Sequence, residues 1–333
     1  MKKPLAKLGV GPMSLEIIEA VFRYSDTKES PLMLIPSLSQ INFSGGYVNN
    51  WTTTQFAEFI ALMRKKYQKA VVYMCRDHCG PGFNGDNLLD VQKNIDDDID
   101  NGFNLIHIDF SKLKGSYDDI LQESKKAIIN IKAKNPQVMI EVGTDENTGA
   151  FLEDIERIEK EMQFFTSICP IEFFVCQTGS LVKEVNQRGG FNASFLEKVK
   201  EKADKFNLAL KEHNADYLDS SLIGQRKGII SALNVAPQCG VLQTQLTIEK
   251  CLFYGIDFTD FLQEAYNSRK WEKWMDKSQP SNAFLCSIIA GHYVFAGESY
   301  KKLFYKISQR ENFQETVINY FIDYINYYVE NFS

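Results

Sequence analysis

Residues that could bind a metal, transfer a proton or contact a ligand gather at the carboxyl ends of several apolar runs of this sequence. In chain order they are Asp77 and His78, His107 and Asp109, Glu141, Gln177 with Thr178 and Gly179, Glu212 with His213 and Asn214, and Asn234. Three of the four histidines of the chain belong to this set. Histidines from separate segments, with carboxylates beside them, are typical of a metal site or an acid–base site. The pattern therefore favours a functional site over scattered core residues.

Asp77 and His78 are adjacent in the sequence. Neighbouring side chains of a strand point to opposite faces, so both reach one pocket only where the chain turns, and the Cys-Gly-Pro-Gly at 79–82 predicts such a turn. A neutral imidazole can bind a divalent metal while the carboxylate beside it exchanges a proton with substrate. His107 and Asp109 share one face, where they could line the site or form a buried hydrogen-bonded pair that only supports it.

The apolar runs recur between longer helical segments. They span residues 5–10, 32–36, 71–75, 105–109, 138–142, 172–176, 208–212 and 229–235. Alternating strands and helices predict right-handed crossovers and a parallel sheet, and eight such units predict a closed barrel with its function on the loops after the strands. We therefore expect an α/β protein, a (β/α)8 TIM barrel over residues 1–250.

Beyond residue 250 the strand signal ends and helical patterns continue. The segments 282–307 and 312–332 read as helices with aromatic stripes, which predict packing against the barrel or another subunit. We expect residues 251–333 to form a C-terminal helical extension packed on the barrel, with a structural role for His292. Within the barrel, Ser194 followed by Glu197 predicts a helix that begins at Ser194.

Length and composition exclude several classes of protein. The chain has 333 residues, 24% of them charged, and a formal net charge of −6 without a clustered basic stripe, which argues against a dedicated nucleic-acid binder. Because it has neither a secretory signal pattern nor a run of roughly 18 apolar residues, we expect a cytoplasmic protein without a membrane span. Seven cysteines, mostly in apolar stretches, fit buried, reduced thiols.

The strand-end residues lie in stretches that resemble the class II aldolase superfamily. The matching stretches are SLSQINFSGGY (37–47), RDHCGP (76–81), GFNLIHIDFS (102–111), IEVGTDENTG (140–149), CQTGSLVKE (176–184), KEHNADYL (211–218) and LNVAPQCGVLQT (233–244). Their order and spacing are most similar to the subunit family of bacterial tagatose-bisphosphate aldolase that is usually called noncatalytic. The resemblance covers nearly the whole chain and implies the TIM barrel.

The resemblance also implies roles for individual residues. His78 and His213 match metal-binding histidines of the catalytic enzymes, and Asp77 matches their proton-transferring aspartate. Glu141 matches a glutamate that can approach the metal, and Asp109 an aspartate near it. Asn234 matches an asparagine that faces the substrate, which makes Asp77, Asp109 and Asn234 the expected catalytic residues.

One metal-binding histidine of the catalytic enzymes is missing. Thr178 stands at its position, with Gln177 beside it, so Glu141, Gln177 or water would have to complete the ligand shell of His78 and His213. The expected cofactor is a divalent metal, zinc first, with manganese or another ion as the alternative.

The expected substrate contacts come from the same stretches. NADYL replaces the Gly- and Ser-rich loop by which many catalytic members bind a substrate phosphate, whereas Gly179, Ser180 and Lys183 could still contact one through N–H groups and charge. The full expected set is Ser37, Gln40, Gly179, Ser180, Lys183 and Asn214.

Three functions are compatible with these residues. The leading hypothesis is a metal-dependent class II aldolase-like lyase acting on a sugar or sugar phosphate, in which the metal stabilises an enediolate and Asp77 handles the proton on the aldehyde oxygen. The second is a noncatalytic partner that stabilises a separate aldolase subunit. The third is a sugar epimerase or isomerase that uses the same site. A homo-oligomer is possible in each case.

Overall fold

Eight parallel strands close into a barrel, which confirms the predicted (β/α)8 fold. The computed structural model describes residues 2–83, 87–143, 154–276 and 282–332. The barrel strands are β1 (Leu8–Val10), β2 (Leu32–Leu34), β3 (Val72–Cys79), β4 (Leu105–Ile108), β5 (Met139–Val142), β6 (Phe173–Val175), β9 (Ala209–Glu212) and β10 (Ala232–Val235), and β10 pairs with β1 to close the ring. Seven of the eight predicted apolar runs contain a whole strand, and the run 71–75 contains the first half of β3.

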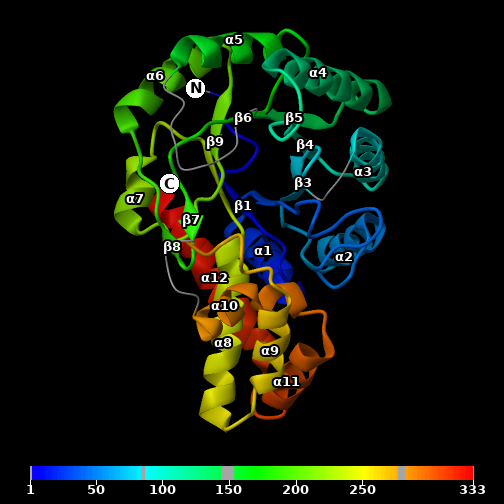
Figure 1. The fold of residues 1–333 in the computed structure, drawn as a ribbon, viewed down its shortest axis with the longest axis vertical. Coiled ribbons are helices and arrows are strands. Elements are labelled where there is room, and N and C mark those ends of the chain that lie inside the picture. Colours follow the sequence, from blue (N-terminus) through cyan, green and yellow to red (C-terminus); the bar gives the residue numbers. More distant parts are fainter. Residues whose placement is uncertain (1, 84–86, 144–153, 277–281, 333) are drawn as a thin grey trace.

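Helices surround the barrel and continue beyond it (Figure 1). Those that follow barrel strands are α1 (Leu15–Lys28), α2 (Thr53–Lys66), α3 (Leu88–Asp100), α4 (Tyr117–Lys134), α5 (Ile155–Thr166), α6 (Ala193–Lys205), α7 (Ser220–Gln225) and α8 (Pro237–Tyr254). Helix α6 begins at Ala193, because the side chain of Asn192 accepts a hydrogen bond from the backbone N–H of Phe195 and caps the helix. The capping residue is therefore Asn192, two positions before the predicted Ser194.

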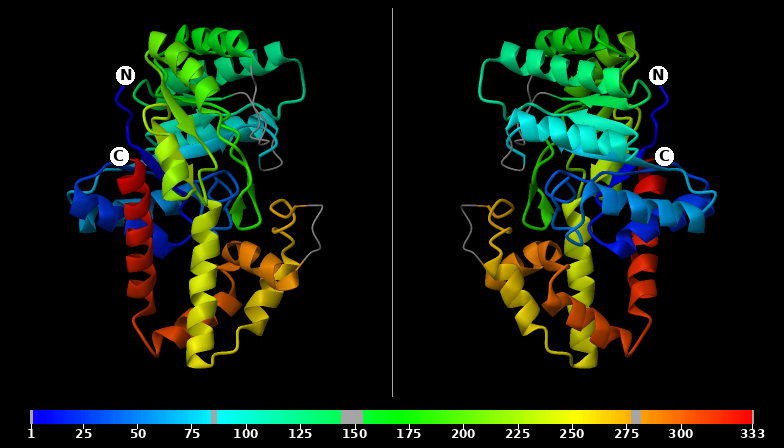
Figure 2. Two further views of the ribbon diagram at one scale, coloured as in Figure 1. Left: turned by 90° about the vertical axis from the view of Figure 1, so that its left-hand side faces the viewer. Right: turned by 90° about the vertical axis from the view of Figure 1, so that its right-hand side faces the viewer.

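The C-terminal part of the chain is helical, as its sequence pattern indicates. After α8 come α9 (Thr259–Asn267), α10 (Ala283–Ala290), the 3-10 helix η1 (Gly291–Val294), α11 (Glu298–Ser308) and α12 (Phe313–Phe332). These helices form a bundle below the barrel, and α12 returns beside α8 to pack on α1 and α7 (Figure 2). Residues 282–307 therefore form two α-helices with η1 between them.

A small antiparallel ribbon interrupts the strand-helix rhythm after β6. It consists of β7 (Val182–Lys183) and β8 (Asn186–Gln187), and no sequence pattern predicted it. Its position matters for the site, because Lys183 lies on it.

The barrel strands are buried on both faces, which explains their continuous apolar runs. Leu105, Phe173 and Ala209 belong to a small cluster, separate from the larger core that packs helices against strands.

Charged residues that interrupt the strands are paired. The guanidinium of Arg76 contacts Asp98 of α3 at 2.7 and 2.6 Å, with both side chains fully buried. Strand β3 is thereby fixed against α3 immediately before its functional residues.

Candidate metal and substrate site

Strand β3 continues beyond its apolar run and ends irregularly. Its register with β4 shifts after Arg76, and His78 has a left-handed φ of +48°. This break in the alternation of faces lets Asp77 and His78 reach the same cluster. Gly80 follows, where a Cβ would lie 1.5 Å from the carbonyl oxygen of Asp109, so the close approach of the two backbones requires glycine.

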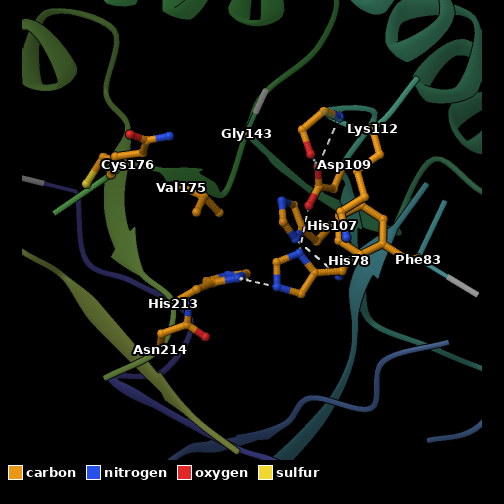
Figure 3. Close-up of a pocket in the computed structure, with 12 residues that line it drawn as sticks. His78, Phe83, His107, Asp109, Lys112, Gly143, Val175, Cys176, His213 and Asn214 are labelled. Atoms are coloured by element: carbon orange, nitrogen blue, oxygen red, sulfur yellow. Dashed lines mark hydrogen bonds and ion pairs between the residues drawn. The ribbon is translucent and has the colours of Figure 1, made fainter. Parts of the chain in front are cut away.

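Three histidines converge where β3, β4 and β9 end (Figure 3). The ring centroids of His78 and His107 lie 5.2 Å apart, and the ring of His213 lies 4.9 Å from each of them. One ring nitrogen of each histidine lies within 4.8 Å of a ring nitrogen of the other two, so the three could hold a metal ion. Of the two roles left open for His107, its position is that of a residue lining the site.

Carboxylates extend the group of possible metal ligands. Asp77, His107, Glu141 and His213 form a second, fully buried set with donor atoms within 4.8 Å of one another. His107 thus adds a third imidazole to the expected pair of His78 and His213, and Glu141 stays a possible ligand.

In His78 and His213, one ring nitrogen is hydrogen-bonded to a carboxylate, which fixes the orientation of the ring. Nδ1 of His78 donates a hydrogen bond to Oδ2 of Asp109 at 2.6 Å, and Nε2 of His213 donates one to Oε1 of Glu141 at 2.8 Å. Asp109 is fixed in turn by the hydroxyl of Ser111, which donates to its Oδ1 at 2.6 Å. The remaining nitrogens, Nε2 of His78 and Nδ1 of His213, face each other at 3.3 Å. This is the arrangement that carboxylates give to metal-binding histidines.

The carboxylates and burial set the protonation of the cluster. Burial alone would lower the pKa of His78, but Asp77 and the hydrogen-bonded Asp109 raise it to about 9. Burial lowers the pKa of His107 and of His213 to about 3, so both rings are neutral at pH 7. Burial would raise the pKa of Asp109, but the hydrogen bond and charge of His78 hold it below its usual range.

Asp77 lies beside the histidines without a short hydrogen bond to them. Its Oδ1 is 3.5 Å from Nδ1 of His213, and its Oδ2 is 3.8 Å from Nε2 of His78. Nδ2 of Asn234 donates a long hydrogen bond of 3.4 Å to Oδ1 of Asp77. Gly9 leaves the space that Asn234 occupies, because a Cβ there would lie 2.3 Å from Oδ1 of Asn234.

A cavity of about 170 Å³ opens above the histidines (Figure 3). Of the described residues, those lining it are His78, Phe83, His107, Asp109, Ser111, Lys112, Gly143, Val175, Cys176, Gln177, His213 and Asn214. Gln177 and Asn214 are thus in a position to contact a bound molecule. Asp77 and Glu141 are not among the lining residues, but each contacts His213, which is.

The other expected substrate contacts make bonds within the protein. The backbone N–H of Ser37 donates to Oε1 of Gln40 at 2.6 Å, and Nε2 of Gln40 lies 3.1 Å from the sulfur of Met13. The hydroxyl of Ser180 donates to the carbonyl oxygen of His213 at 3.1 Å. None of Ser37, Gln40 and Ser180 lines the cavity in the described part of the chain.

Gly179 and Lys183 also lie away from the cavity lining. The ammonium of Lys183 donates to the carbonyl oxygen of Lys273 at 3.1 Å, and Gly179 packs so closely on Gly189 that a Cβ at Gly189 would lie 1.8 Å from its carbonyl oxygen. Lys183 and Gly179 thus make contacts within the protein, and their expected role at a phosphate stays a prediction.

Sequence reasoning missed several residues of the site, among them Phe83, Lys112 and Lys211. Lys211 forms a buried ion pair with Glu141 at 2.7 Å, while Phe83 and Lys112 line the cavity. A signal for Lys211 exists, since it lies two residues before His213 and so shares its face of the strand. For Phe83 and Lys112, which lie in loops, no periodicity gives such a signal.

Comparisons with known proteins agree on the fold. No protein-family model matches the chain, and no curated protein matches it. Among solved structures, a probable tagatose 6 phosphate kinase from Sinorhizobium meliloti is similar over 98% of this chain and 99% of its own, with a TM-score of 0.76 and 14% identity. The YdjI aldolase from Escherichia coli is similar over 91% of both chains, with a TM-score of 0.56 and 12% identity.

A further similar structure is fructose-bisphosphate aldolase from Campylobacter jejuni, which matches over 90% of both chains with a TM-score of 0.54 and 14% identity. At these identities the similarity shows the fold alone. The chain thus has the TIM barrel that its sequence resemblance implied, and aldolases are among the solved structures that are similar to it. Separately, no helix in the described ranges has both the length and the apolar character to cross a membrane.

Proposed function

We propose that this chain is a metal-dependent class II aldolase-like enzyme, a lyase that cleaves or forms a carbon–carbon bond in a sugar or sugar phosphate. The observation that carries this proposal is the convergence of His78, His107 and His213 on one cavity at the strand ends of an aldolase-like barrel. The structurally similar proteins are named as aldolases and as a kinase of a sugar phosphate, which supports that substrate class.

The donor set fits a divalent metal. His107 and His213 are neutral at pH 7 because burial lowers the pKa of each to about 3, and a neutral imidazole is the form that binds metals. Nε2 of His107 is buried without a hydrogen-bond partner in the described ranges, whereas Nδ1 of the same ring accepts a hydrogen bond from the backbone N–H of His78 at 3.3 Å. One nitrogen of the ring is therefore left without a bond to the protein. His78, whose pKa Asp77 and Asp109 raise to about 9, would release its proton when it binds the ion. Three imidazoles then favour zinc, with manganese or another divalent ion as the alternative.

A metal held by these histidines would supply Lewis-acid polarisation of a substrate carbonyl. The chain's own residues supply the rest. Asp109 and Glu141 orient His78 and His213 through the hydrogen bonds to their outer ring nitrogens. This assigns Asp109 a positioning role in place of the catalytic role expected from the sequence.

Asp77 is the group we assign to proton transfer. Its carboxylate stands within 4 Å of both His78 and His213 but makes no short bond to either. It can therefore give a proton to the aldehyde oxygen or take one from it as the carbon–carbon bond forms or breaks. Asn234, which donates to Asp77, positions this carboxylate.

The test is an exchange and condensation assay on metal-loaded protein. Dihydroxyacetone phosphate is incubated in D₂O with and without an aldehyde, and both deuterium uptake beside the carbonyl and a new ketose are followed by NMR. We expect both. Exchange without a ketose would instead identify an epimerase or isomerase using the same site. Neither exchange nor ketose would contradict the proposal and favour a noncatalytic partner of an aldolase subunit.

A further inference from the structure

We propose that Lys112 binds the phosphate group of the substrate and so selects phosphorylated sugars. The reaction named here rests on the proposed function, but the anion site rests on separate observations. Lys112 is the one lysine or arginine among the described residues that line the cavity. It lies in the loop after β4, next to Ser111, and on the opposite side of the site from Cys176 and Asn214 (Figure 3).

The ammonium of Lys112 is held in place by an aromatic ring. It lies 4.0 Å from the ring centroid of Phe83, and the Phe83 ring stacks on His78 with centroids 5.0 Å apart and an interplanar angle of 18°. The charge therefore stands beside the histidine cluster and is separated from it by one ring. A cation at this spacing suits an anion at one end of a molecule whose carbonyl reaches the histidines.

The side chain of Lys112 is exposed, and its positive charge has no ionic partner among the residues that the structure describes. Within the described ranges no carboxylate lies within 4.0 Å of its ammonium, whereas the nearby Asp109 is occupied by His78 and Ser111. An unpaired ammonium facing a cavity is complementary to an anionic ligand. Phosphate is the anion that the sugar-phosphate substrate class provides.

Two residues expected to bind phosphate, Lys183 and Ser180, donate hydrogen bonds to backbone carbonyl oxygens. The ammonium of Lys183 bonds to the carbonyl oxygen of Lys273, and the hydroxyl of Ser180 bonds to the carbonyl oxygen of His213. Neither lines the cavity. The anion site consequently moves from the loop after β6 to the loop after β4.

Calorimetric titration of the full chain with inorganic phosphate, dihydroxyacetone phosphate and dihydroxyacetone tests this assignment. The variants are Lys112→Met, Lys112→Arg, Lys183→Met and, as a matched control, Lys114→Met, an exposed lysine in the same loop that does not line the cavity. We expect Lys112→Met to weaken binding of both phosphate ligands by roughly tenfold or more, because a charged hydrogen bond is lost. Lys112→Arg should retain most of the binding, and Lys114→Met all of it.

Binding of the neutral dihydroxyacetone should be the same in wild type and Lys112→Met. Unchanged phosphate binding in Lys112→Met, loss in Lys183→Met instead, or no phosphate binding to the wild type would overturn the assignment. Because these readouts need no turnover, an enzyme that binds phosphate through Lys112 but fails the exchange assay would refute the proposed reaction and leave the anion site standing.

Discussion

The ammonium of Lys211 lies 2.7 Å from Oε2 of Glu141, and the two side chains are only 1% and 0% exposed. The other oxygen of the carboxylate accepts the hydrogen bond from Nε2 of His213 at 2.8 Å. Both oxygens of Glu141 are therefore engaged by the protein. We infer that Glu141 orients His213 rather than serving mainly as the metal ligand expected from the sequence.

Lys211→Met should destabilise the fold, since it leaves the carboxylate of Glu141 buried without its cation. Breaking a buried ion pair on one side costs about 3 kcal/mol of unfolding free energy. The double variant Lys211→Met with Glu141→Gln should recover part of that loss, because no uncompensated charge remains. Urea unfolding of the wild type, Lys211→Met, Glu141→Gln and the double variant measures both effects. If Lys211→Met were as stable as the wild type, the ion pair would not be formed in solution.

Asp77→Asn should abolish turnover in the aldol assay while metal content stays at the wild-type level. The amide keeps the shape of the side chain but cannot exchange the proton, and the effect of such a change on the rate is about 10² to 10⁴. Elemental analysis and the NMR assay on the same preparation separate the two effects. Full activity would reject the assigned role, and loss of metal would make Asp77 a ligand.

Gly9→Ala should impair the site through Asn234. The new Cβ would lie 2.3 Å from Oδ1 of Asn234 and 2.9 Å from Cγ2 of Ile35, so the amide must move away from Asp77. We expect turnover to fall roughly tenfold and stability by about 1 to 3 kcal/mol. Gly224→Ala is the control, since nothing lies within 4 Å of its Cβ position and alanine favours helix α7. Equal behaviour of the two variants would argue against a precise position for Asn234.

Asp216 gives the fold a pH dependence that can be measured. Burial raises the pKa of its carboxyl to about 7, whereas in an unfolded chain it titrates near a pH of about 4. Between these values the folded state holds a proton that the unfolded state has lost. The free energy of unfolding therefore falls as the pH rises, by about 3 kcal/mol from pH 5 to pH 8.

Asp216→Asn isolates this contribution. The asparagine oxygen can still accept the hydrogen bonds that Oδ1 of Asp216 takes from the backbone N–H groups of Ala236 and Gln238, both at 2.9 Å. Between pH 5 and pH 8 the free energy of unfolding of the variant, measured in urea, should rise relative to that of the wild type by the same amount, about 3 kcal/mol. A constant difference across this range would show that Asp216 titrates at an ordinary pH.

The barrel could be predicted because its strands are buried on both faces. Continuous apolar runs at regular spacing predict a parallel sheet, and the presence of eight such runs predicts that this sheet closes into a barrel. The sequence also predicts that the polar residues after β3, β4 and β9 gather at one end. The small ribbon of β7 and β8 escaped prediction, since strands of two residues have no periodicity.

The sequence predicts which residues lie at the strand ends, but it does not predict where each of their side chains points. His107 shares a face with Asp109, but period two does not say whether that face points into the site or toward the helices. The left-handed backbone at His78 accompanies the shift of register between β3 and β4, and no local sequence pattern predicts it. Lys183 was expected at the phosphate because of its motif, yet the ribbon turns it to Lys273.

Metal content measured by elemental analysis tests the central claim most directly. Protein purified without a metal-affinity tag is compared with His107→Ala and His213→Ala, and with His292→Ala, which removes a buried histidine outside the cluster. We predict about one equivalent of zinc or a similar ion in wild type and in His292→Ala, and loss of that ion in both cluster variants. No metal in the wild type after incubation with zinc or manganese, or full metal in His107→Ala, would contradict the three-histidine site.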